Sequence, residues 1–341
     1  MHSRRREGLA LLVSLVVLAL ALGLLTRLLT LKRHDMGSTW GHFLQEEEHS
    51  IDLLFLGSSL VYCDVVPAVI WEETGLTGYV MAGPEQTLPM TYYYLREALQ
   101  TQQPQAVFVE ITGVFYARYT GYTKTNIGQM PWGMNRLQAT FREAEPENRA
   151  GLLFPLLFYH DRWSSLTADD FAVTFRGYEP DPLAGYTFLN TYCETDGVSD
   201  RALTRDAANE ARNWDALTAI YDLCLEEDIQ PVFYVAPCLH RIPEAAMEPL
   251  QARIREALPE APLLDCNDHF AAIGADESTD FFDPLHYNAA GAEKFSRFLG
   301  GWISDNLKLS PEPGRDAALW QSRLDHFRQL ASTPPTPQDA P

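Results

Sequence analysis

The sequence predicts an α/β protein whose parallel sheet is covered by helices on both faces. Short and almost wholly apolar runs alternate along the chain with longer stretches that have helical spacing. These runs do not alternate between polar and apolar residues, so both faces of each strand should be buried, as is typical of parallel sheets. The chain has 341 residues, of which 46% are hydrophobic, and this is enough for one large domain or two smaller ones.

The first element is a long apolar segment near the N-terminus. Residues 8–26 read GLALLVSLVVLALALGLLT and carry no charge. About 20 apolar residues are enough to cross a bilayer as a helix. A cleaved signal peptide usually has a shorter apolar core followed by a small-x-small site, and the small-x-small pattern at residues 19–21 lies inside the run. We therefore expect residues 1–34 to form an uncleaved, single-pass membrane anchor.

The charges indicate how this anchor is oriented. Arg4, Arg5 and Arg6 precede the apolar segment, and the positive-inside rule places such a cluster in the cytoplasm. Residues from about 35 onward are then expected to be extracytoplasmic. The net charge of the chain is −20. Because such an acidic surface repels phosphate backbones, the composition argues against a nucleic-acid partner.

The α/β pattern follows the anchor and begins with IDLLFLG at residues 51–57, which is too apolar for the edge of a sheet. We expect strands at 51–57, 78–83, 104–113, 231–237 and 262–268. We expect helices at 90–102, 206–228, 243–258 and 288–307. The main domain is therefore expected over residues 50–307.

Two segments do not follow this alternation of strands and helices. Residues 117–205 are rich in aromatic residues, glycine and proline, and an insertion of this length is expected to form a cap rather than a bare loop. In residues 308–341, one helix-like stretch places Trp320, Leu324 and Phe327 on a common face. The final STPPTPQDAP is expected to be disordered.

Residues that could carry chemistry follow the first strand and precede the last helix. Gly57, Ser58 and Ser59 come directly after the first strand, and ligands of open parallel sheets bind at the carboxyl ends of strands. Asp283 and His286 lie three positions apart in FFDPLHYNAAG. That spacing can place a carboxylate beside an imidazole, which would remove a proton from a serine hydroxyl.

Two of these stretches resemble motifs of the SGNH/GDSL hydrolases. FLGSSLVY resembles the first block of that family and DPLHYNAAG its last block. The resemblance covers about residues 50–307, with the 117–205 insertion as a departure. It implies a flavodoxin-like, three-layer α/β/α fold in which Ser59 is the nucleophile, His286 the base and Asp283 the residue that orients His286.

The resemblance also implies an oxyanion hole, which in this family uses the serine N–H, a glycine and an asparagine. Gly83 matches the glycine, but no asparagine follows AVFVEIT, where Thr112 stands instead. Gln86 is an alternative donor. Losing one such donor typically lowers the rate by about 10²–10³.

Other candidates lie in the insertion. His160 and Arg162, in FYHDRW, could bind an anionic or sugar substrate, or could hold the cap together. Trp132 and Trp163 could stack on sugar rings, although core packing is the more ordinary role of such residues. The five cysteines are scattered without zinc-type spacing. We expect buried free thiols, and no metal or organic cofactor.

The predicted function is that of a membrane-anchored, extracytoplasmic serine esterase acting on acyl esters of cell-envelope glycans or polymers. The architecture is similar to that of the alginate O-acetyltransferase group and of the D-alanine transfer protein of teichoic-acid systems. Two alternatives stay open. One is O-acyl transfer to a surface polysaccharide. The other is a degenerate domain that binds an envelope glycan or a protein partner.

Overall fold

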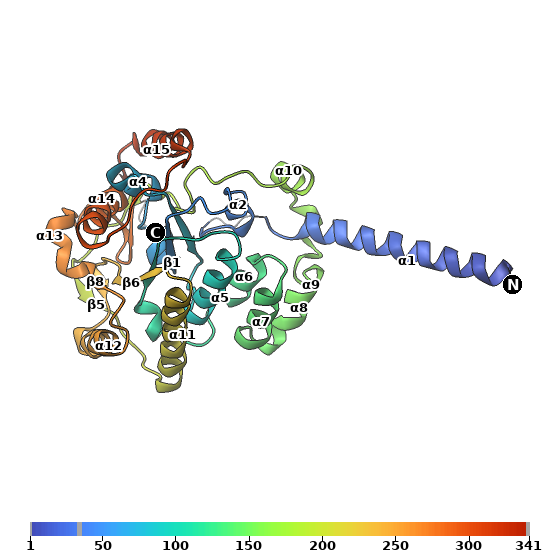
Figure 1. Ribbon diagram of the computed structural model, residues 1–341, viewed down its shortest axis with the longest axis horizontal. Helices are drawn as coiled ribbons and strands as arrows, with labels where there is room; N and C mark the ends of the chain where they lie inside the picture. The colour runs from blue at the N-terminus through green and yellow to red at the C-terminus, as the bar shows by residue number, and fades with distance from the viewer. Residues whose placement is uncertain (1, 33–35, 339–341) are drawn as a thin grey trace.

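A five-stranded parallel sheet lies at the centre of the protein, with the strand order β2-β1-β3-β6-β8 (Figure 1). The computed structural model describes residues 2–32 and 36–338. The five strands are β1 (Leu53–Gly57), β2 (Gly78–Ala82), β3 (Ala106–Glu110), β6 (Gln230–Val235) and β8 (Leu263–Asp265). Each overlaps an expected strand, with β6 beginning one residue before the expected range 231–237, and all neighbouring pairs are parallel. The predicted parallel α/β fold is confirmed.

The side chains of each strand divide between two hydrophobic cores. In β1, Leu54 and Leu56 belong to one core, whereas Leu53 and Phe55 belong to the other. The first core is covered by α2 (Trp40–Phe43), α5 (Leu88–Ala98), α11 (Ala207–Glu226) and α12 (Glu244–Ala257). The second core is covered by α3 (Ser59–Tyr62), α4 (Pro67–Thr74), α13 (Phe270–Ile273) and α14 (Ala289–Asn306).

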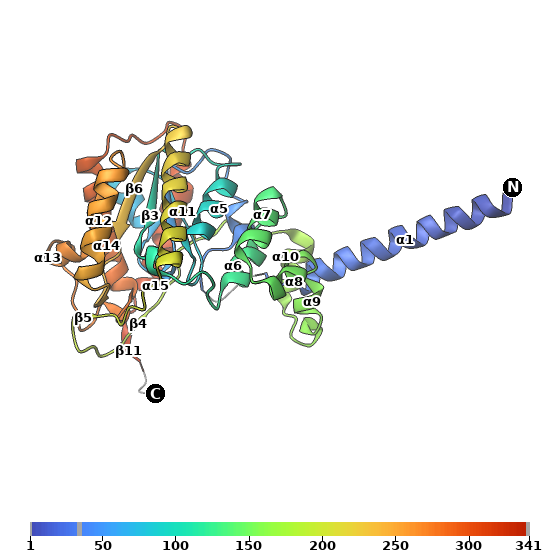
Figure 2. The same cartoon turned by 90° about the horizontal axis from the view of Figure 1, so that it is seen from below.

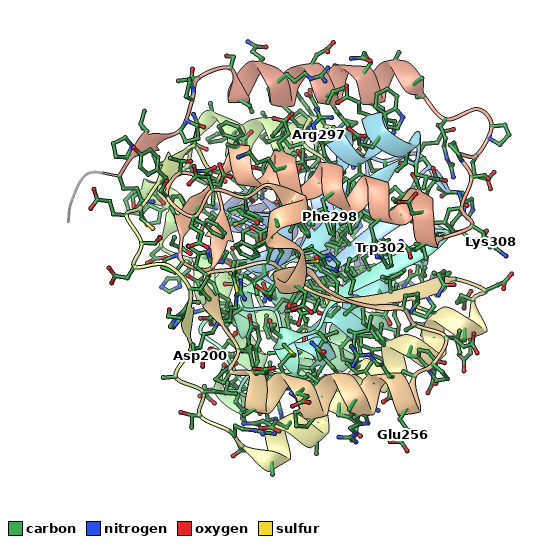
Figure 3. The ribbon with its side chains drawn as sticks, turned by 90° about the vertical axis from the view of Figure 1, so that its left-hand side faces the viewer. Asp200, Glu256, Arg297, Phe298, Trp302 and Lys308 are labelled. Carbon is green, nitrogen blue, oxygen red and sulfur yellow. The ribbon has the colours of Figure 1, made fainter. Side chains whose placement is uncertain are left out.

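The helices therefore form two outer layers around the sheet. In Figure 3, Glu256 on α12 lies below the strands, and Phe298 and Trp302 on α14 lie above them. The Trp302 ring also packs edge-on against Phe108 of β3, with 6.5 Å between the ring centroids. This is the three-layer arrangement that near-continuous apolar strands require, because neither face of the sheet can remain in water.

The 117–205 segment contains short helices followed by irregular chain. The helical elements are η1 (Thr112–Phe115) just before it and then α6 (Thr123–Gln129), α7 (Met134–Glu143), η2 (Pro146–Asn148), α8 (Arg149–Leu153), α9 (Leu156–Tyr159), η3 (Arg162–Ser164) and α10 (Ala168–Arg176). Figures 1 and 2 place α6–α10 together at the end of the domain from which the N-terminal helix leaves.

Short strands build the remaining connections around the carboxyl end of the sheet. They are β4 (Thr191–Tyr192), β5 (Ser199–Asp200), β7 (His240–Arg241), β9 (Phe281–Asp283), β10 (His286–Tyr287) and β11 (Thr336–Pro337), with the helical turn η4 (Cys266–His269). The β9–β10 pair is antiparallel and brings Asp283 opposite His286.

The N-terminal helix α1 (His2–Leu29) extends away from the domain (Figures 1 and 2). Its stretch Arg5–Leu29 is long and apolar enough to cross a membrane, and none of this window is buried against the rest of the chain. Membrane anchors and signal sequences share these properties. The expected boundary of the anchor, at residue 34, lies outside the described residues.

The C-terminal segment packs on the domain through α15 (Ala317–Ala331). Trp320 stacks on Trp71 of α4, and Leu324 and Phe327 are buried. The tail differs from the expected disorder, because β11 pairs in parallel with β4. Residues 339–341 of that tail lie outside the described residues.

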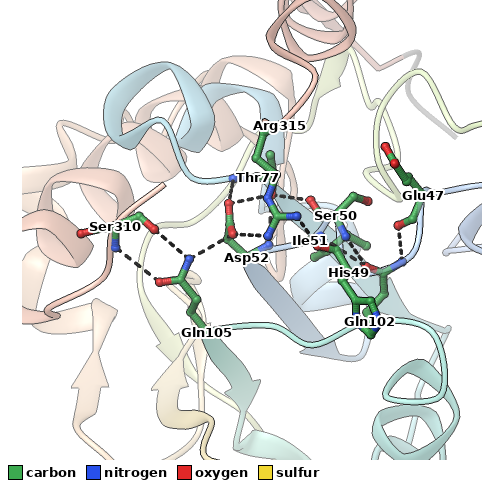
Figure 4. Close-up of polar contacts among 10 residues, drawn as sticks. All are labelled: Glu47, His49, Ser50, Ile51, Asp52, Thr77, Gln102, Gln105, Ser310 and Arg315. Carbon is green, nitrogen blue, oxygen red and sulfur yellow. Dashed lines mark hydrogen bonds and ion pairs between the residues drawn. The ribbon is translucent and has the colours of Figure 1, made fainter. Parts of the chain in front are cut away.

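A polar network at the amino end of β1 fastens the same C-terminal segment to the sheet (Figure 4). The fully buried carboxylate of Asp52 accepts hydrogen bonds from the backbone N–H (2.9 Å) and hydroxyl (2.8 Å) of Thr77. It also accepts from Gln105 at 3.0 Å and pairs with Arg315 at 2.7 Å. This network stabilises the end of the sheet opposite the one at which the candidate site lies.

Candidate active site

The site begins where β1 ends in Gly57. This residue has a φ of 154°, and a Cβ built on it would lie 2.6 Å from Val61 Cγ2. Glycine therefore permits the tight passage from the strand into α3, which starts at Ser59. Ser58 is buried, with its hydroxyl 3.1 Å from that of Tyr116. The two adjacent serines thus face different surroundings, and Ser59 is the one beside the imidazole of His286.

Three side chains form a continuous chain of hydrogen bonds. The Ser59 Oγ lies 2.7 Å from His286 Nε2, and His286 Nδ1 lies 2.9 Å from both carboxylate oxygens of Asp283. A carboxylate only accepts hydrogen bonds, so Nδ1–H donates to Asp283. Nε2 is then the acceptor for the Ser59 hydroxyl, as a general base requires.

Asp283 is held in its ionised form. Burial by itself would raise the pKa of this carboxyl, but the hydrogen bond and charge of His286 and the backbone N–H groups of Leu285 and His286 outweigh it. These backbone bonds are 2.8 and 3.0 Å long. The net result is a pKa below the ordinary value of an aspartate. A charged Asp283 favours the imidazolium that forms when His286 takes a proton.

The backbone N–H groups of Ser59 and Gly83 are the candidates for stabilising an oxyanion. Ser59 is the first residue of α3 and Gly83 directly follows β2, the neighbour of β1 in the sheet. Within residues 2–32 and 36–338, neither N–H has a hydrogen-bond acceptor. Unpaired donors at the start of a helix are the usual components of an oxyanion hole. Gly83 therefore stays a candidate second donor.

Gln86 and Thr112, the other expected donors, are engaged elsewhere. The side-chain amide of Gln86 donates to Thr91 at 3.1 Å. The hydroxyl and backbone N–H of Thr112 both donate to the carboxylate of Glu110, at 2.8 and 3.1 Å. The structure thus gives each of these donors a partner within the protein fold.

Asn126, on α6, contacts the site, and no sequence argument pointed to it. A Cβ built on Gly83 would lie 2.3 Å from Asn126 Oδ1. The side-chain amide of Asn126 donates to the backbone carbonyl of Pro84 at 3.0 Å. This asparagine therefore packs on the Gly83 loop, although it comes from the insertion rather than from the chain after β3. No local motif marks it.

A cavity of about 700 Å³ opens beside Ser59 and His286. Its wall includes the tyrosines Tyr62, Tyr116, Tyr119 and Tyr122. Arg201 also lines the cavity, with its Nε–H donating to the carbonyl of His240 at 2.5 Å. These residues lie on irregular chain or at helix ends, where the sequence has no periodic signal that would have identified them.

His160 and Arg162 do not line this cavity, so its walls give no support to a substrate-binding role for them. Arg162 forms a bidentate pair with Asp170, at 2.9 Å to each oxygen, and donates to the carbonyl of Leu29 at 2.8 Å. His160 is exposed. The FYHDRW segment therefore lies at the end of α1. Trp132 and Trp163, expected in the core, are 57% and 72% exposed.

No arrangement suited to a metal ion occurs among the described residues, since no three His, Cys, Asp or Glu side chains converge there. All five cysteines are free, and four of them, Cys63, Cys224, Cys238 and Cys266, are buried. Burial raises the pKa of the Cys63 thiol beside the cavity. A thiol with a raised pKa is a poor nucleophile, so the chemistry available at the site is that of Ser59.

Comparison with known proteins yields only a distant structural similarity. No model of a protein family matches the chain, and no curated protein matches it. Among solved structures, an acetyl xylan esterase (Est2A) from the rumen bacterium Butyrivibrio proteoclasticus is similar with a TM-score of 0.34 and 10% sequence identity. The similarity covers 76% of this chain and 64%, less than two thirds, of that esterase.

Proposed function

We propose that this chain is a serine esterase of the SGNH type that cleaves acyl esters of cell-envelope glycans or polymers outside the cytoplasm. The observation that carries the proposal is the hydrogen-bonded series from Ser59 through His286 to Asp283. Serine, histidine and carboxylate in this order form the apparatus of acyl transfer on several unrelated folds. The apolar helix α1 supports an extracytoplasmic position next to the membrane.

The first half of the reaction acylates the enzyme. As Ser59 Oγ attacks the ester carbonyl, its proton passes to His286 Nε2, and the carbonyl oxygen becomes an oxyanion facing the N–H groups of Ser59 and Gly83. The ester C–O bond then breaks, and His286 returns the proton to the leaving alcohol. Asp283 keeps the imidazole oriented and stabilises its protonated form.

The second half releases the acyl group. Water loses a proton to His286 and attacks the acyl-serine carbonyl, and Ser59 recovers its proton as the free acid leaves. A polymer hydroxyl in place of water would give O-acyl transfer by the same steps. Product analysis separates the two reactions, because transfer yields acylated acceptor and little free acid.

The cavity walls support a glycan substrate. Four tyrosines surround the space beside Ser59, and aromatic faces pack well against the apolar faces of sugar rings. A cavity of about 700 Å³ is large enough for a residue of a polymer together with its acyl group. Arg201 places a cation in the wall, which suits a glycan that carries a carboxylate or phosphate.

Intact-mass measurement after exposure to a fluorophosphonate tests the proposal. The full chain in detergent micelles should gain the mass of one phosphonyl group. Ser59→Ala and His286→Ala should gain none, whereas Ser58→Ala, the matched control at the adjacent hydroxyl, should still be labelled. An unlabelled but folded wild-type chain would contradict the proposal and favour a domain that binds glycan without turnover.

A further inference from the structure

Six exposed apolar side chains lie on the segments next to the C-terminal end of α1. We call this group the apolar collar, and it consists of Trp132, Phe154, Leu157, Trp163, Phe171 and Phe175. Their exposed fractions range from 46% for Phe171 to 72% for Trp163. Large exposed apolar groups that lie together mark interaction surfaces rather than ordinary protein surface.

Direct contacts fix the collar relative to α1. Helices α9 and α10, which carry Leu157, Phe171 and Phe175, contact α1. Arg162 donates to the carbonyl of Leu29 at 2.8 Å, and the Tyr178 hydroxyl donates to the carbonyl of Lys32 at 2.9 Å. Figures 1 and 2 both show α1 leaving the domain beside α9 and α10. The collar is therefore on the side of the domain toward which α1 extends.

We infer that the collar lies on the surface of a phospholipid bilayer, with its aromatic side chains at the level of the lipid headgroups. The apolar stretch Arg5–Leu29 has 25 residues, a helical length of about 37 Å. The hydrocarbon core of a bilayer is only about 30 Å thick. A bilayer crossed by α1 thus reaches its interface near the last turns of the helix, where the collar begins.

The chemistry of the collar matches this interface. Tryptophan and other aromatic residues concentrate at the level of the headgroups, and five of the six collar residues are aromatic. Although the chain has a net charge of −20, residues 118–176 contain seven Lys or Arg and six Asp or Glu. This part of the acidic chain is nearly neutral, so it can approach anionic lipids without strong repulsion.

A cavity of about 620 Å³ lies between α1 and the collar, and its walls suit a phospholipid. Apolar walls are provided by Leu22, Leu153 and Phe154, whereas Arg27 and Lys32 line it with cations. A phospholipid has apolar chains that would contact the apolar walls and an anionic phosphate that would contact the cations. The cavity is therefore suited to one lipid of the leaflet in which α1 ends.

The inference goes beyond esterase activity and does not depend on it, but it bears on where the catalytic cavity lies. Tyr122 lines that cavity and directly precedes α6, and Trp132 of the collar follows the same helix. Seven residues of helix span about 10 Å. A collar on the bilayer would hold the cavity near the membrane surface, within reach of polymers that are attached to lipids.

Quenching of tryptophan fluorescence by brominated lipids tests this inference. The full chain is reconstituted into phosphatidylcholine–phosphatidylglycerol nanodiscs with either brominated or ordinary acyl chains. Helix α1 contains no tryptophan, and Trp40, Trp214 and Trp320 are buried in the domain. The chain that co-elutes with nanodiscs should therefore show weaker tryptophan emission in brominated than in ordinary lipid. The decrease should equal the emission that Trp132 and Trp163 contribute.

Paired variants identify the source of the quenching. Trp132→Phe/Trp163→Phe keeps the collar apolar and should lose most of the difference between the two lipids. The matched control Trp71→Phe/Trp302→Phe, on α4 and α14, should retain it. Equal wild-type emission in both lipids would overturn the inference and leave the collar to a protein partner. Failure to co-elute, or quenching that persists in Trp132→Phe/Trp163→Phe, would also overturn it.

Discussion

The buried carboxylate of Asp64 accepts a hydrogen bond from the backbone N–H of Tyr287 at 2.9 Å. Asp64 lies five positions after Ser59, and Tyr287 is the residue that follows His286. One hydrogen bond thus ties the segment carrying the nucleophile to the segment carrying the base. Burial raises the pKa of Asp64 well above its ordinary value, against the opposing effect of the Tyr287 N–H.

We predict that Asp64→Ala lowers kcat with little change in KM, because the backbone beside His286 loses the hydrogen bond that holds it in position. It should also lower the free energy of unfolding by about 1–3 kcal/mol, since the buried N–H of Tyr287 loses its acceptor. Asp64→Asn keeps a carbonyl oxygen and should restore most of kcat. Hydrolysis of p-nitrophenyl acetate, with unfolding followed by circular dichroism, measures both effects. Wild-type kcat in Asp64→Ala would contradict the positioning role.

A second prediction concerns the partner of the imidazole. Asp283→Asn should reduce kcat by about 10³–10⁴, because an asparagine side-chain N–H favours the wrong tautomer of His286 and cannot stabilise the imidazolium. Fluorophosphonate labelling should slow in parallel. Glu277→Gln, which removes an exposed carboxylate six positions earlier in the chain, is the control and should keep wild-type rates. If both variants react at the same rate, Asp283 has no part in activating Ser59.

The sheet and its main helices could be predicted from sequence because their signals are local. The apolar run of β1 and the helical spacing of α11 each depend on residues close together in the chain. The C-terminal tail was less predictable. The pairing of β11 with β4 joins Thr336 to Thr191, and no pattern within the tail reports a partner so distant in the sequence.

The same distinction applies to the site. Ser59, Asp283 and His286 stand in two short motifs, so their proximity could be anticipated. Asn126 and Arg201 reach the site through packing between segments far apart in the chain, which sequence spacing does not encode. The role of Arg162 stayed open at the level of sequence for a related reason. A cation beside aromatic residues suits a binding pocket and a helix-end contact equally well, and only the contacts with Leu29 and Asp170 distinguish them.

A third prediction follows from Glu110, which is buried at the end of β3. Burial raises the pKa of this carboxyl to about 7, despite the hydrogen bonds from Thr112. Folding therefore favours the protonated form, so the stabilising contribution is complete below about pH 4.5 and is lost as the pH rises to about 7. At about 1.4 kcal/mol per pH unit, the loss is roughly 3 kcal/mol.

Glu110→Gln removes this titration while keeping a hydrogen-bonding side chain of the same shape. The free energy of unfolding of the wild type, relative to the variant, should therefore fall between pH 5 and pH 8. Urea unfolding at several pH values measures the difference. Parallel stability curves for the two proteins would show that Glu110 is charged in the folded state throughout this range.

The last prediction concerns the network at the opposite end of β1 (Figure 4). Arg315→Met leaves the fully buried Asp52 without its cation, and breaking a buried ion pair typically costs about 3–5 kcal/mol. Thr77 and Gln105 still donate to Asp52, which places the expected loss at the lower end of that range. Arg328→Met breaks the exposed pair with Glu72 and should cost much less, because solvent screens such pairs.

Urea unfolding of both variants in the same detergent micelles checks this contrast, with fluorophosphonate labelling as a second readout. Arg315→Met should unfold at a clearly lower urea concentration than Arg328→Met. It should nevertheless be labelled at the wild-type rate below its transition, because Asp52 and Ser59 lie at opposite ends of β1. A similar midpoint for both variants would mean that Thr77 and Gln105 alone satisfy Asp52. The link from Arg315 to the sheet would then contribute little to stability.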